Sequence, residues 1–353
     1  MGFLISSGPD HWRSACRVRR RVAPARRRRK ILPQINTLTV GVVFVALTAI
    51  GLVVATKQQE ANVNRADALG GVMADKSGPF ANYLLVGSDT RETADPNSPD
   101  YGGIGSTNEA GGRRSDTVMI LHVDNELGTA SMMSLPRDLW VDIPGFGKDR
   151  LNSAYSHGPE VLVDTIQTSL GIPLNHYIEV DFTSFKNIVS ALGGVDVCFE
   201  YPTRDINTGL NVPTPGCFTL DQYQSLAYAR SRYYEVFRED AWDVDGRADL
   251  GRIERQQIFL QAAISKAIQQ TTANPMRTSE LINAAVNSLT VDPGLNLFEA
   301  ADYLRPLASG GVKRYPLSVV PEMVDDKDVL VLGAEAGAVL AYFAGTAGPP
   351  PVG

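Results

Sequence analysis

The sequence predicts an α/β protein: a single layered α-β-α domain with a mixed central sheet, preceded by one N-terminal transmembrane helix. Two observations predict this fold. From about residue 80 onward, short apolar runs typical of buried strands alternate with amphipathic helical patterns, which favours layers of helices around a sheet. Near the N-terminus, residues 38–55 form an 18-residue run without a charge. A helix of that length spans about 27 Å, close to the thickness of a bilayer.

The N-terminal charges predict the topology. Residues 1–30 hold ten Lys or Arg residues and one acid, Asp10, although the 353-residue chain carries a net charge of −6. A basic block directly before an apolar run places the block in the cytoplasm and the following chain outside. We expect a basic cytoplasmic tail (1–30), a transmembrane helix (31–56), a stalk (57–78), an extracellular domain (79–345) and a disordered tail (346–353). A cleaved signal peptide is the alternative; a nucleic-acid-binding arm is disfavoured because no aromatic residue interleaves the arginines.

Two aspartates flank the first predicted strands. Residues 82–86 (NYLLV) read as a buried strand that runs into Asp89, and residues 117–123 (TVMILHV) as a second strand that begins after Asp116. If the strands are antiparallel neighbours, the two carboxylates meet at one edge of the sheet. Such oxygen pairs bind magnesium beside phosphates, although aspartates at strand ends are also common without a metal.

The remaining elements continue the alternation. Further strands are expected over residues 129–135, 139–143, 176–180, 195–199, 289–291 and 312–320. Helices are expected over residues 159–170, 182–192, 220–227, 251–270, 279–288, 296–307 and 335–343.

Residues 228–257 hold a concentration of arginines that we interpret as an anion site. Arg230 and Arg232 would share a face of an extended segment, while Arg252, Arg255 and Gln256 fall in the first turns of a helix. Cations are unfavourable at a helix N-terminus unless an anion is bound there, which indicates a phosphate or diphosphate. The acids of the same stretch offer a plainer reading, in which every arginine forms a surface ion pair.

Two cysteines, Cys198 and Cys217, lie 19 residues apart on the predicted outer side, and Cys16 lies on the inner side. In an oxidising compartment the outer two would form a disulfide. Two buried thiols remain the alternative.

Six ordered motifs resemble those of the LytR-CpsA-Psr family, over roughly residues 79–345. They are GSDTR (87–91), RSDTVM (114–119), SLPRD (134–138), LNSAY (151–155), YARSRY (228–233) and DLGRIERQQ (249–257). The resemblance implies a membrane-anchored bacterial phosphotransferase. Such an enzyme moves a glycopolymer, arabinogalactan or teichoic-acid-like, from a polyprenyl diphosphate carrier to the muramic acid of peptidoglycan. The insert between Arg232 and Asp249, which contains Trp242, departs from the family's spacing.

The resemblance also implies roles for individual residues. Asp89 and Asp116 would bind magnesium, or manganese in its place. The diphosphate would be bound by Arg114, Arg137, Arg230, Arg232, Arg252, Arg255 and Gln256, of which Arg137, Arg230, Arg232, Arg252 and Arg255 would be catalytic. The helices would have to leave an apolar groove for the lipid.

Two other functions fit the same residues: hydrolysis of a polyprenyl diphosphate, and lipid binding without catalysis. The general base stays open between Asp138 and Asp249, either of which would serve equally to orient an arginine. The partners expected are a lipid-linked glycan and peptidoglycan, with no nucleic acid.

Overall fold

A computed structural model of the chain describes residues 63–76, 78–88, 115–297, 300 and 312–351. The basic tail, the apolar run 38–55, the loop 92–112 and most of the helix expected over 296–307 lie outside these ranges. Within them, no helix is both long enough and apolar enough to cross a membrane.

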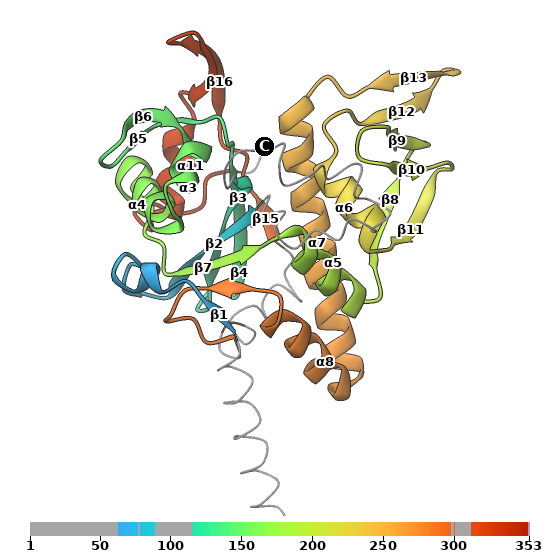
Figure 1. The fold of residues 1–353 in the computed structure, drawn as a ribbon, viewed down its shortest axis with the longest axis horizontal. Coiled ribbons are helices and arrows are strands. Elements are labelled where there is room, and N and C mark those ends of the chain that lie inside the picture. Colours follow the sequence, from blue (N-terminus) through green and yellow to red (C-terminus); the bar gives the residue numbers. More distant parts are fainter. Residues whose placement is uncertain (1–62, 77, 89–114, 298–299, 301–311, 352–353) are drawn as a thin grey trace, which may run out of the picture. The chain divides into compact units, whose positions relative to one another are not determined.

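The architecture is built on a seven-stranded mixed sheet (Figure 1). In spatial order its strands are β1 (Asn64–Arg65), β14 (Thr290–Val291), β7 (His176–Val180), β2 (Phe80–Ser88), β3 (Ser115–Asp124), β4 (Thr129–Leu135) and β15 (Val312–Arg314). The central pairs β2–β3 and β3–β4 are antiparallel, whereas β7 runs parallel to β2. The mixed sheet is therefore confirmed, and the antiparallel pairing of β2 and β3 meets the condition on which the expected proximity of residues 89 and 116 depends.

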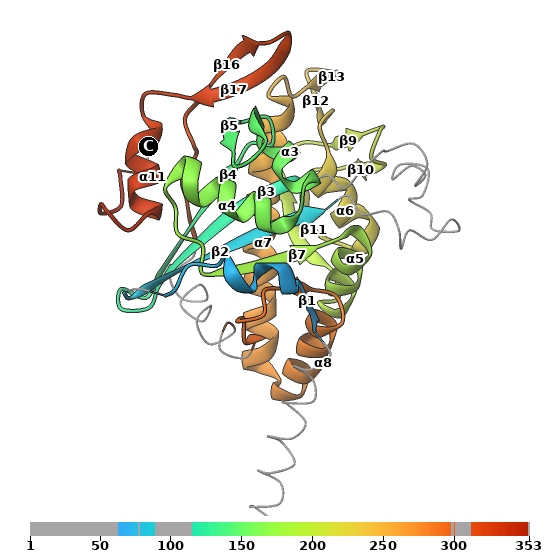
Figure 2. The same ribbon diagram turned by 60° about the vertical axis from the view of Figure 1, so that its left-hand side comes forward.

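Helices cover both faces of this sheet (Figure 2). They are η1 (Asp67–Gly71), α3 (Leu151–Ser156), α4 (Pro159–Leu170), α5 (Phe182–Ala191), α6 (Gln222–Arg230), α7 (Ala248–Ala273), α8 (Pro275–Val286) and α11 (Ala336–Phe343). Sequence signals define several ends: the Asp181 carboxylate accepts from Ser184 N at the start of α5, and α4 ends at Gly171 in the left-handed conformation. The layered α-β-α arrangement agrees with the prediction.

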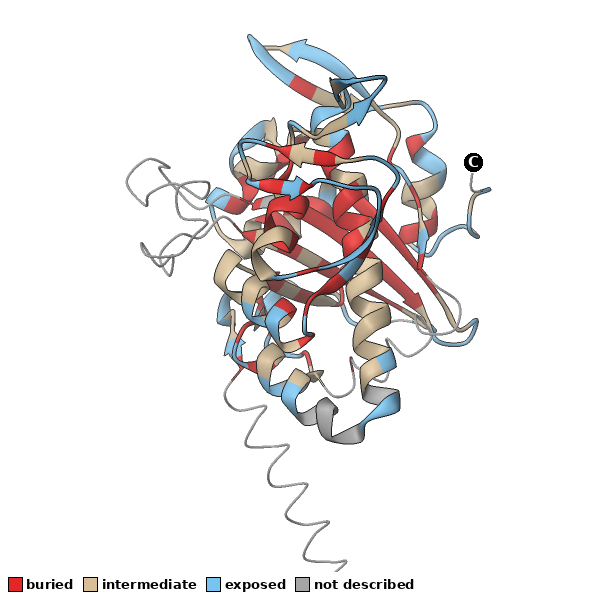
Figure 3. Cartoon of the chain, turned by 90° about the vertical axis from the view of Figure 1, so that its right-hand side faces the viewer, coloured by how far each residue is buried: buried red, intermediate tan, exposed pale blue. Residues whose placement is uncertain are grey.

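Each face of the sheet has its own apolar core, because side chains alternate along each strand. Leu84, Ile120 and Met133 pack with η1, α3, α4 and α11 on one face, where Leu69 and Tyr155 are also almost wholly buried. Tyr83, Leu121 and Met132 point to the opposite face, against α7 and α8. Figure 3 shows the buried residues concentrated in the sheet between these layers.

Smaller sheets surround the central layer. Their strands are β5 (Trp140–Ile143), β6 (Gly147–Arg150), β8 (Val195–Phe199), β9 (Thr203–Asp205), β10 (Leu210–Val212), β11 (Gly216–Leu220), β12 (Glu235–Arg238), β13 (Ala241–Val244), β16 (Val319–Val324) and β17 (Lys327–Leu332). The insert after Arg232 forms the hairpin β12–β13, which joins β9 and β10 in a four-stranded sheet. Cys198 on β8 and Cys217 on β11 face each other in the register and form the expected disulfide.

Two expectations about the elements are wrong. The strand expected over 312–320 is two strands in different sheets, β15 and β16, because Pro316 lacks the N–H that a continuing ladder needs and Tyr315 is buried in the core. The segment expected to be a stalk contributes to the folded domain from Val63 onward: β1 pairs with β14, and Leu69 is fully buried. Apolar Val63 and Leu69 account for this, since both are buried against the sheet.

Candidate active site

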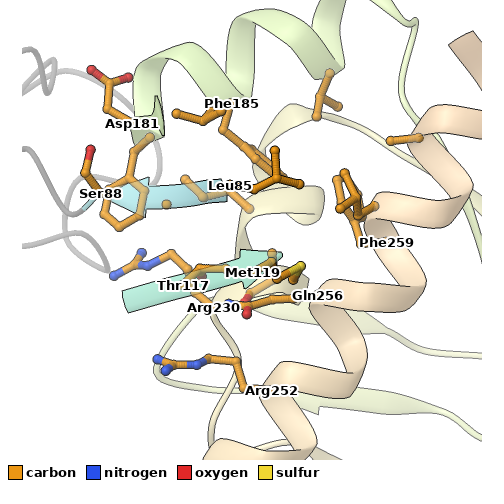
Figure 4. A pocket seen from close by; sticks show the side chains of 18 of the residues that line it. Leu85, Ser88, Thr117, Met119, Asp181, Phe185, Arg230, Arg252, Gln256 and Phe259 are labelled. Carbon is orange, nitrogen blue, oxygen red and sulfur yellow. The ribbon is translucent and has the colours of Figure 1, made fainter. Parts of the chain in front are cut away.

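A cavity of about 590 Å³ lies between one face of the central sheet and helices α5, α6 and α7 (Figure 4). Its interior is apolar. The interior side chains come from the sheet and all three helices: Leu85, Met119, Ile178, Phe185, Ile188, Val189, Leu192, Leu226, Phe259, Leu260 and Ala263. The cavity falls within the range of volumes found for small-molecule sites, which are mostly apolar with a few placed polar groups. It therefore supplies the apolar groove that the family resemblance implied.

Four of the predicted arginines line the same cavity: Arg137, Arg230, Arg232 and Arg252, together with Gln256. They come from distant parts of the chain. Arg137 follows β4, Arg230 is the last residue of α6, and Arg252 lies in the first turns of α7. In Figure 4 the guanidinium groups of Arg230 and Arg252 point in the same direction, away from Phe259 and the apolar interior. The cavity is thus amphipathic, apolar inside and cationic at its mouth.

Arg230 does not lie in the extended segment that its spacing from Arg232 suggested. It ends helix α6, and only Ser231 after it leaves the helical conformation. A side chain of α7 caps the end of α6: Gln256 Nε2 donates to the carbonyl oxygen of Ala229 at 3.0 Å. The guanidinium of Arg230 lies 4.7 Å from the ring centre of Phe182, a cation–π contact across the mouth. Arg230 and Arg232 are brought to the cavity by this helix end rather than by a strand.

Arg252 is almost wholly buried, with a side-chain exposure of 3%. Its Nη2 lies 2.7 Å from Asp249 Oδ1, and Nε of Arg232 lies 3.4 Å from the same oxygen. Asp249 therefore holds two arginines of the mouth in one ion-pair cluster. A carboxylate oxygen shared by two guanidinium groups holds them in place, so this geometry gives Asp249 an orienting role toward Arg232 and Arg252.

Asp138 has a similar arrangement. Its carboxylate lies 3.4 Å from Nε of Arg137 and 3.8 Å from Nε of Arg150. Its backbone carbonyl also accepts from Leu330 N, which joins this position to β17. Asp138 thus orients Arg137 from the β17 side.

Arg255 is buried, yet it is not among the residues that line the cavity. Its guanidinium binds Asp245 at 3.1 Å and the carbonyl of Ser231 at 2.7 Å, and it lies 4.3 Å from the ring centre of Tyr234. Gly251 makes this possible, because a Cβ there would lie 2.6 Å from Asp245 Oδ2. The structure therefore separates Arg255 from the other four arginines and gives it a supporting position behind Arg232.

Two residues that contact Arg255 have shifted pKa values: Asp245 stays ionised and Tyr234 stays neutral. Burial raises the pKa of Asp245, but hydrogen bonds from Arg247 and Arg255 outweigh it, so the net pKa lies below the usual value. Burial raises the pKa of the Tyr234 phenol, so the ring beside Arg255 stays neutral. Arg247 itself is 60% exposed and binds Asp245 and Glu254, so it is one of the surface ion pairs that the acidic stretch predicted.

Asp205 is a site residue that the sequence reasoning missed. It is fully buried and lines the cavity. One carboxylate oxygen accepts from the Ser231 hydroxyl at 2.6 Å and from Tyr233 N at 3.0 Å, which fixes the backbone on both sides of Arg232. A charged residue is buried only when it is paired or hydrogen-bonded, but nothing local in the sequence marks those partners, which lie 26 and 28 residues away.

The expected metal position falls at the end of β2 and β3. Gly87 pairs with Thr117 and Ser88 with Ser115, so residue 89 is next in the chain beyond this edge. Asp89 and Arg114 lie outside the described residues, as does the side chain of Asp116. Across the ranges that are described, no group of three or more His, Cys, Asp and Glu side chains could hold a metal.

The sequence model of the LytR_cpsA_psr family matches residues 44–340. The chain belongs to this family. It is 32% identical over 296 residues to the probable cell wall biosynthesis protein LcpB of Corynebacterium glutamicum, an alignment that covers 82% of this chain and 67% of LcpB. It is 32% identical over 185 residues to the polyisoprenyl-teichoic acid–peptidoglycan teichoic acid transferase TagU of Enterococcus faecalis, covering 51% of this chain and 55% of TagU.

Solved structures of the LytR-CpsA-Psr family share the fold. A LytR-Csp2A-Psr enzyme from Actinomyces oris aligns with a TM-score of 0.63 and 25% identity, covering 80% of this chain and 96% of that one. The family protein YwtF (TagT), solved with bound octaprenyl pyrophosphate lipid, aligns with a TM-score of 0.55 and 23% identity, covering 80% and 99%. The α/β fold predicted from the alternation of strands and helices is that of these structures.

Proposed function

We propose that this LytR-CpsA-Psr protein transfers a glycopolymer from a polyprenyl diphosphate carrier to peptidoglycan through a phosphodiester bond. One observation carries the proposal: a single cavity joins an apolar interior to a mouth of four arginines. A molecule that fits both parts has a long apolar chain with a polyanion at one end. The name of TagU and the lipid bound to TagT point to the same class of donor.

The residues of the mouth suit phosphoryl transfer. An acceptor hydroxyl of peptidoglycan attacks the phosphorus nearest the sugar, a new P–O bond forms, and the bond from that phosphorus to the bridging oxygen breaks. Polyprenyl phosphate leaves, and the hydroxyl proton passes to solvent. Charge accumulates on the phosphoryl oxygens during this step, and guanidinium groups already in place stabilise it without reorganisation. Arg137, Arg230, Arg232 and Arg252 would serve in this way, while Gln256 holds the end of α6.

We further propose that magnesium, or manganese, assists at the end of β2 and β3. The pairing of Ser88 with Ser115 supports it, because residues 89 and 116 each adjoin one member of this pair in the chain. Carboxylate oxygens are the ligands that these ions prefer, and Asp89 and Asp116 would hold the ion. When bound, the ion would neutralise part of the diphosphate charge. Chelation with EDTA should abolish transfer and added Mg²⁺ restore it; transfer that persists in EDTA contradicts this part.

We also propose that the folded domain lies outside the cell. The basic residues 1–30 and the uncharged residues 38–55 support a single-pass anchor with a cytoplasmic N-terminus. Protease added to intact protoplasts should remove the folded domain and spare the tail. Cleavage only after lysis contradicts the topology.

The decisive assay uses the full chain in detergent with a radiolabelled lipid-linked oligosaccharide and purified peptidoglycan. We expect label to become covalently attached to peptidoglycan, with release of polyprenyl phosphate. Free glycan phosphate without a linked product would indicate a hydrolase instead. Tight lipid binding with neither product would leave only a lipid-binding protein.

A further inference from the structure

One side of the cavity mouth carries uncharged side chains beside the buried carboxylate of Asp205. It is formed by the turn between β9 and β10, where Asn207 and Thr208 line the cavity, and by Tyr233, directly after Arg232. We call these three residues the neutral rim. Tyr233 lines the cavity and is nevertheless 63% exposed, so its ring is open to a ligand that projects from the mouth. The small sheet that carries the rim lies beside α6 and the first turns of α7 (Figure 1).

The rim contains an unsatisfied hydroxyl. Thr208 Oγ1 is buried and makes no hydrogen bond with any residue that the structure describes. A buried hydroxyl without a partner is unfavourable, so native proteins rarely leave one unless a ligand or water completes it. Thr208 lines the cavity mouth, so a ligand bound there would lie beside this residue, and the exposed Asn207 amide adds donor and acceptor atoms.

The rim is held rigidly against the arginines by Asp205. Its carboxylate accepts from Asn207 N at 2.9 Å and Thr208 N at 3.2 Å on one oxygen, and from Tyr233 N at 3.0 Å on the other. One buried side chain thus ties the β9–β10 turn to the segment that carries Arg232. Binding to preorganised groups loses less entropy than binding to mobile ones.

We propose that the neutral rim binds the sugar attached directly to the diphosphate, and so helps to select the donor. The inference rests on the function proposed above. With the lipid in the apolar interior and the diphosphate at the arginines, the first sugar must leave the cavity at its mouth. Hydroxyl, amide and aromatic groups without charge match a neutral sugar, which offers hydroxyls for hydrogen bonds and an apolar ring face for Tyr233.

The test compares two ligands on the full chain in detergent: undecaprenyl diphosphate, and the same lipid diphosphate carrying one N-acetylglucosamine. Thr208→Val and Tyr233→Ala should each weaken binding of the sugar-bearing lipid by about tenfold, the size of one hydrogen bond or ring contact, and leave the bare lipid unchanged. Thr208→Ser keeps the hydroxyl and should restore binding. Arg252→Ala should weaken both ligands.

Matched controls come from the same region. Tyr201 is 40% exposed and Thr219 is exposed, and neither lines the cavity. Tyr201→Ala and Thr219→Val should change neither affinity. Equal losses for both lipids in the rim variants, or no loss for the sugar-bearing one, would overturn the rim assignment alone. If the unaltered protein binds neither lipid, the proposed function falls, and the assignment falls with it.

Discussion

Both faces of the central sheet carry an apolar core, but only one of them borders the cavity. On the face toward α3, α4 and α11, Leu84 and Ile120 are fully buried in a closed core. On the other face, Leu85 and Met119 border a cavity of about 590 Å³ under α5 and α7. Protein interiors normally leave few voids larger than a water molecule. A void of this size on one face, lined at its mouth by four arginines, therefore indicates a binding site rather than poor packing.

The largest expected effect is on the transfer rate, and it comes from removing an arginine of the cavity mouth. Arg252→Ala should lower the rate of glycopolymer transfer by about 10²- to 10³-fold, the range found when one preorganised charge-stabilising donor is removed. Labelled product on peptidoglycan measures it. Arg247→Ala is the matched control, because Arg247 lies in the same stretch but is 60% exposed and does not line the cavity. Equal rates for the two variants would contradict the role of the mouth.

Two adjacent residues of β2, Leu84 and Leu85, point to opposite faces of the sheet, so substituting each by alanine compares how tightly the two faces are packed. Leu84→Ala should lower the free energy of unfolding by about 2–5 kcal/mol, since it opens a cavity in a closed core. Leu85→Ala should cost about 1 kcal/mol, because its side chain already borders a cavity and is only partly buried. Chemical denaturation of both variants measures the difference. Similar losses would mean that the second face is packed like the first.

The closed face also contains a pH-sensitive residue, His122. Its Nδ1 donates to Asn82 Oδ1 at 2.8 Å, and its ring stacks on Phe80 at 4.7 Å. Burial lowers the pKa of His122 to about 4, against 6.5 for an ordinary histidine. The unfolded chain then binds the extra proton first, so stability is full above pH 6.5 and is lost as pH falls toward 4. The loss is at most about 3 kcal/mol.

Unfolding midpoints measured between pH 4 and 7 check this, with His122→Asn as the comparison. The variant lacks the titrating group, so its stability should fall less over this range. Parallel curves for the two proteins would show that His122 does not contribute.

The smallest expected effect is on ligand binding, and it tests whether the apolar interior and the arginine-lined mouth of the cavity are separate subsites. Ala263→Phe fills part of the apolar interior and should weaken binding of undecaprenyl diphosphate by about tenfold, with little change in stability. Isopentenyl diphosphate, which has only a short chain, should bind this variant as it binds the unaltered protein. A loss for both ligands would mean that the interior and the mouth are not separate subsites.

Arg252 and Arg255 show where reasoning from the sequence stops. Their spacing on α7 placed both on one face of a helix, and both are buried as an anion site would require. Only Arg252 lines the cavity, because the guanidinium of Arg255 is bound by Asp245 and the Ser231 carbonyl, which lie on a different segment. Asp205 was missed for the same reason: its partners lie on other elements, and a lone aspartate gives no local sign of being buried.

The sequence by itself determined the alternation of strands and helices and the set of arginines, and it predicted the disulfide, whereas the antiparallel pairing of β2 and β3 was only a condition that the structure met. The alternation and the arginines follow from periodicity and residue chemistry, which act over a few residues. Only the tertiary structure decided which arginines share a cavity and that this cavity has an apolar interior. It also decided that the insert after Arg232 forms the hairpin β12–β13, which joins β9 and β10 in one sheet. Those properties depend on how separate elements pack, and packing between distant segments leaves no local pattern in the chain.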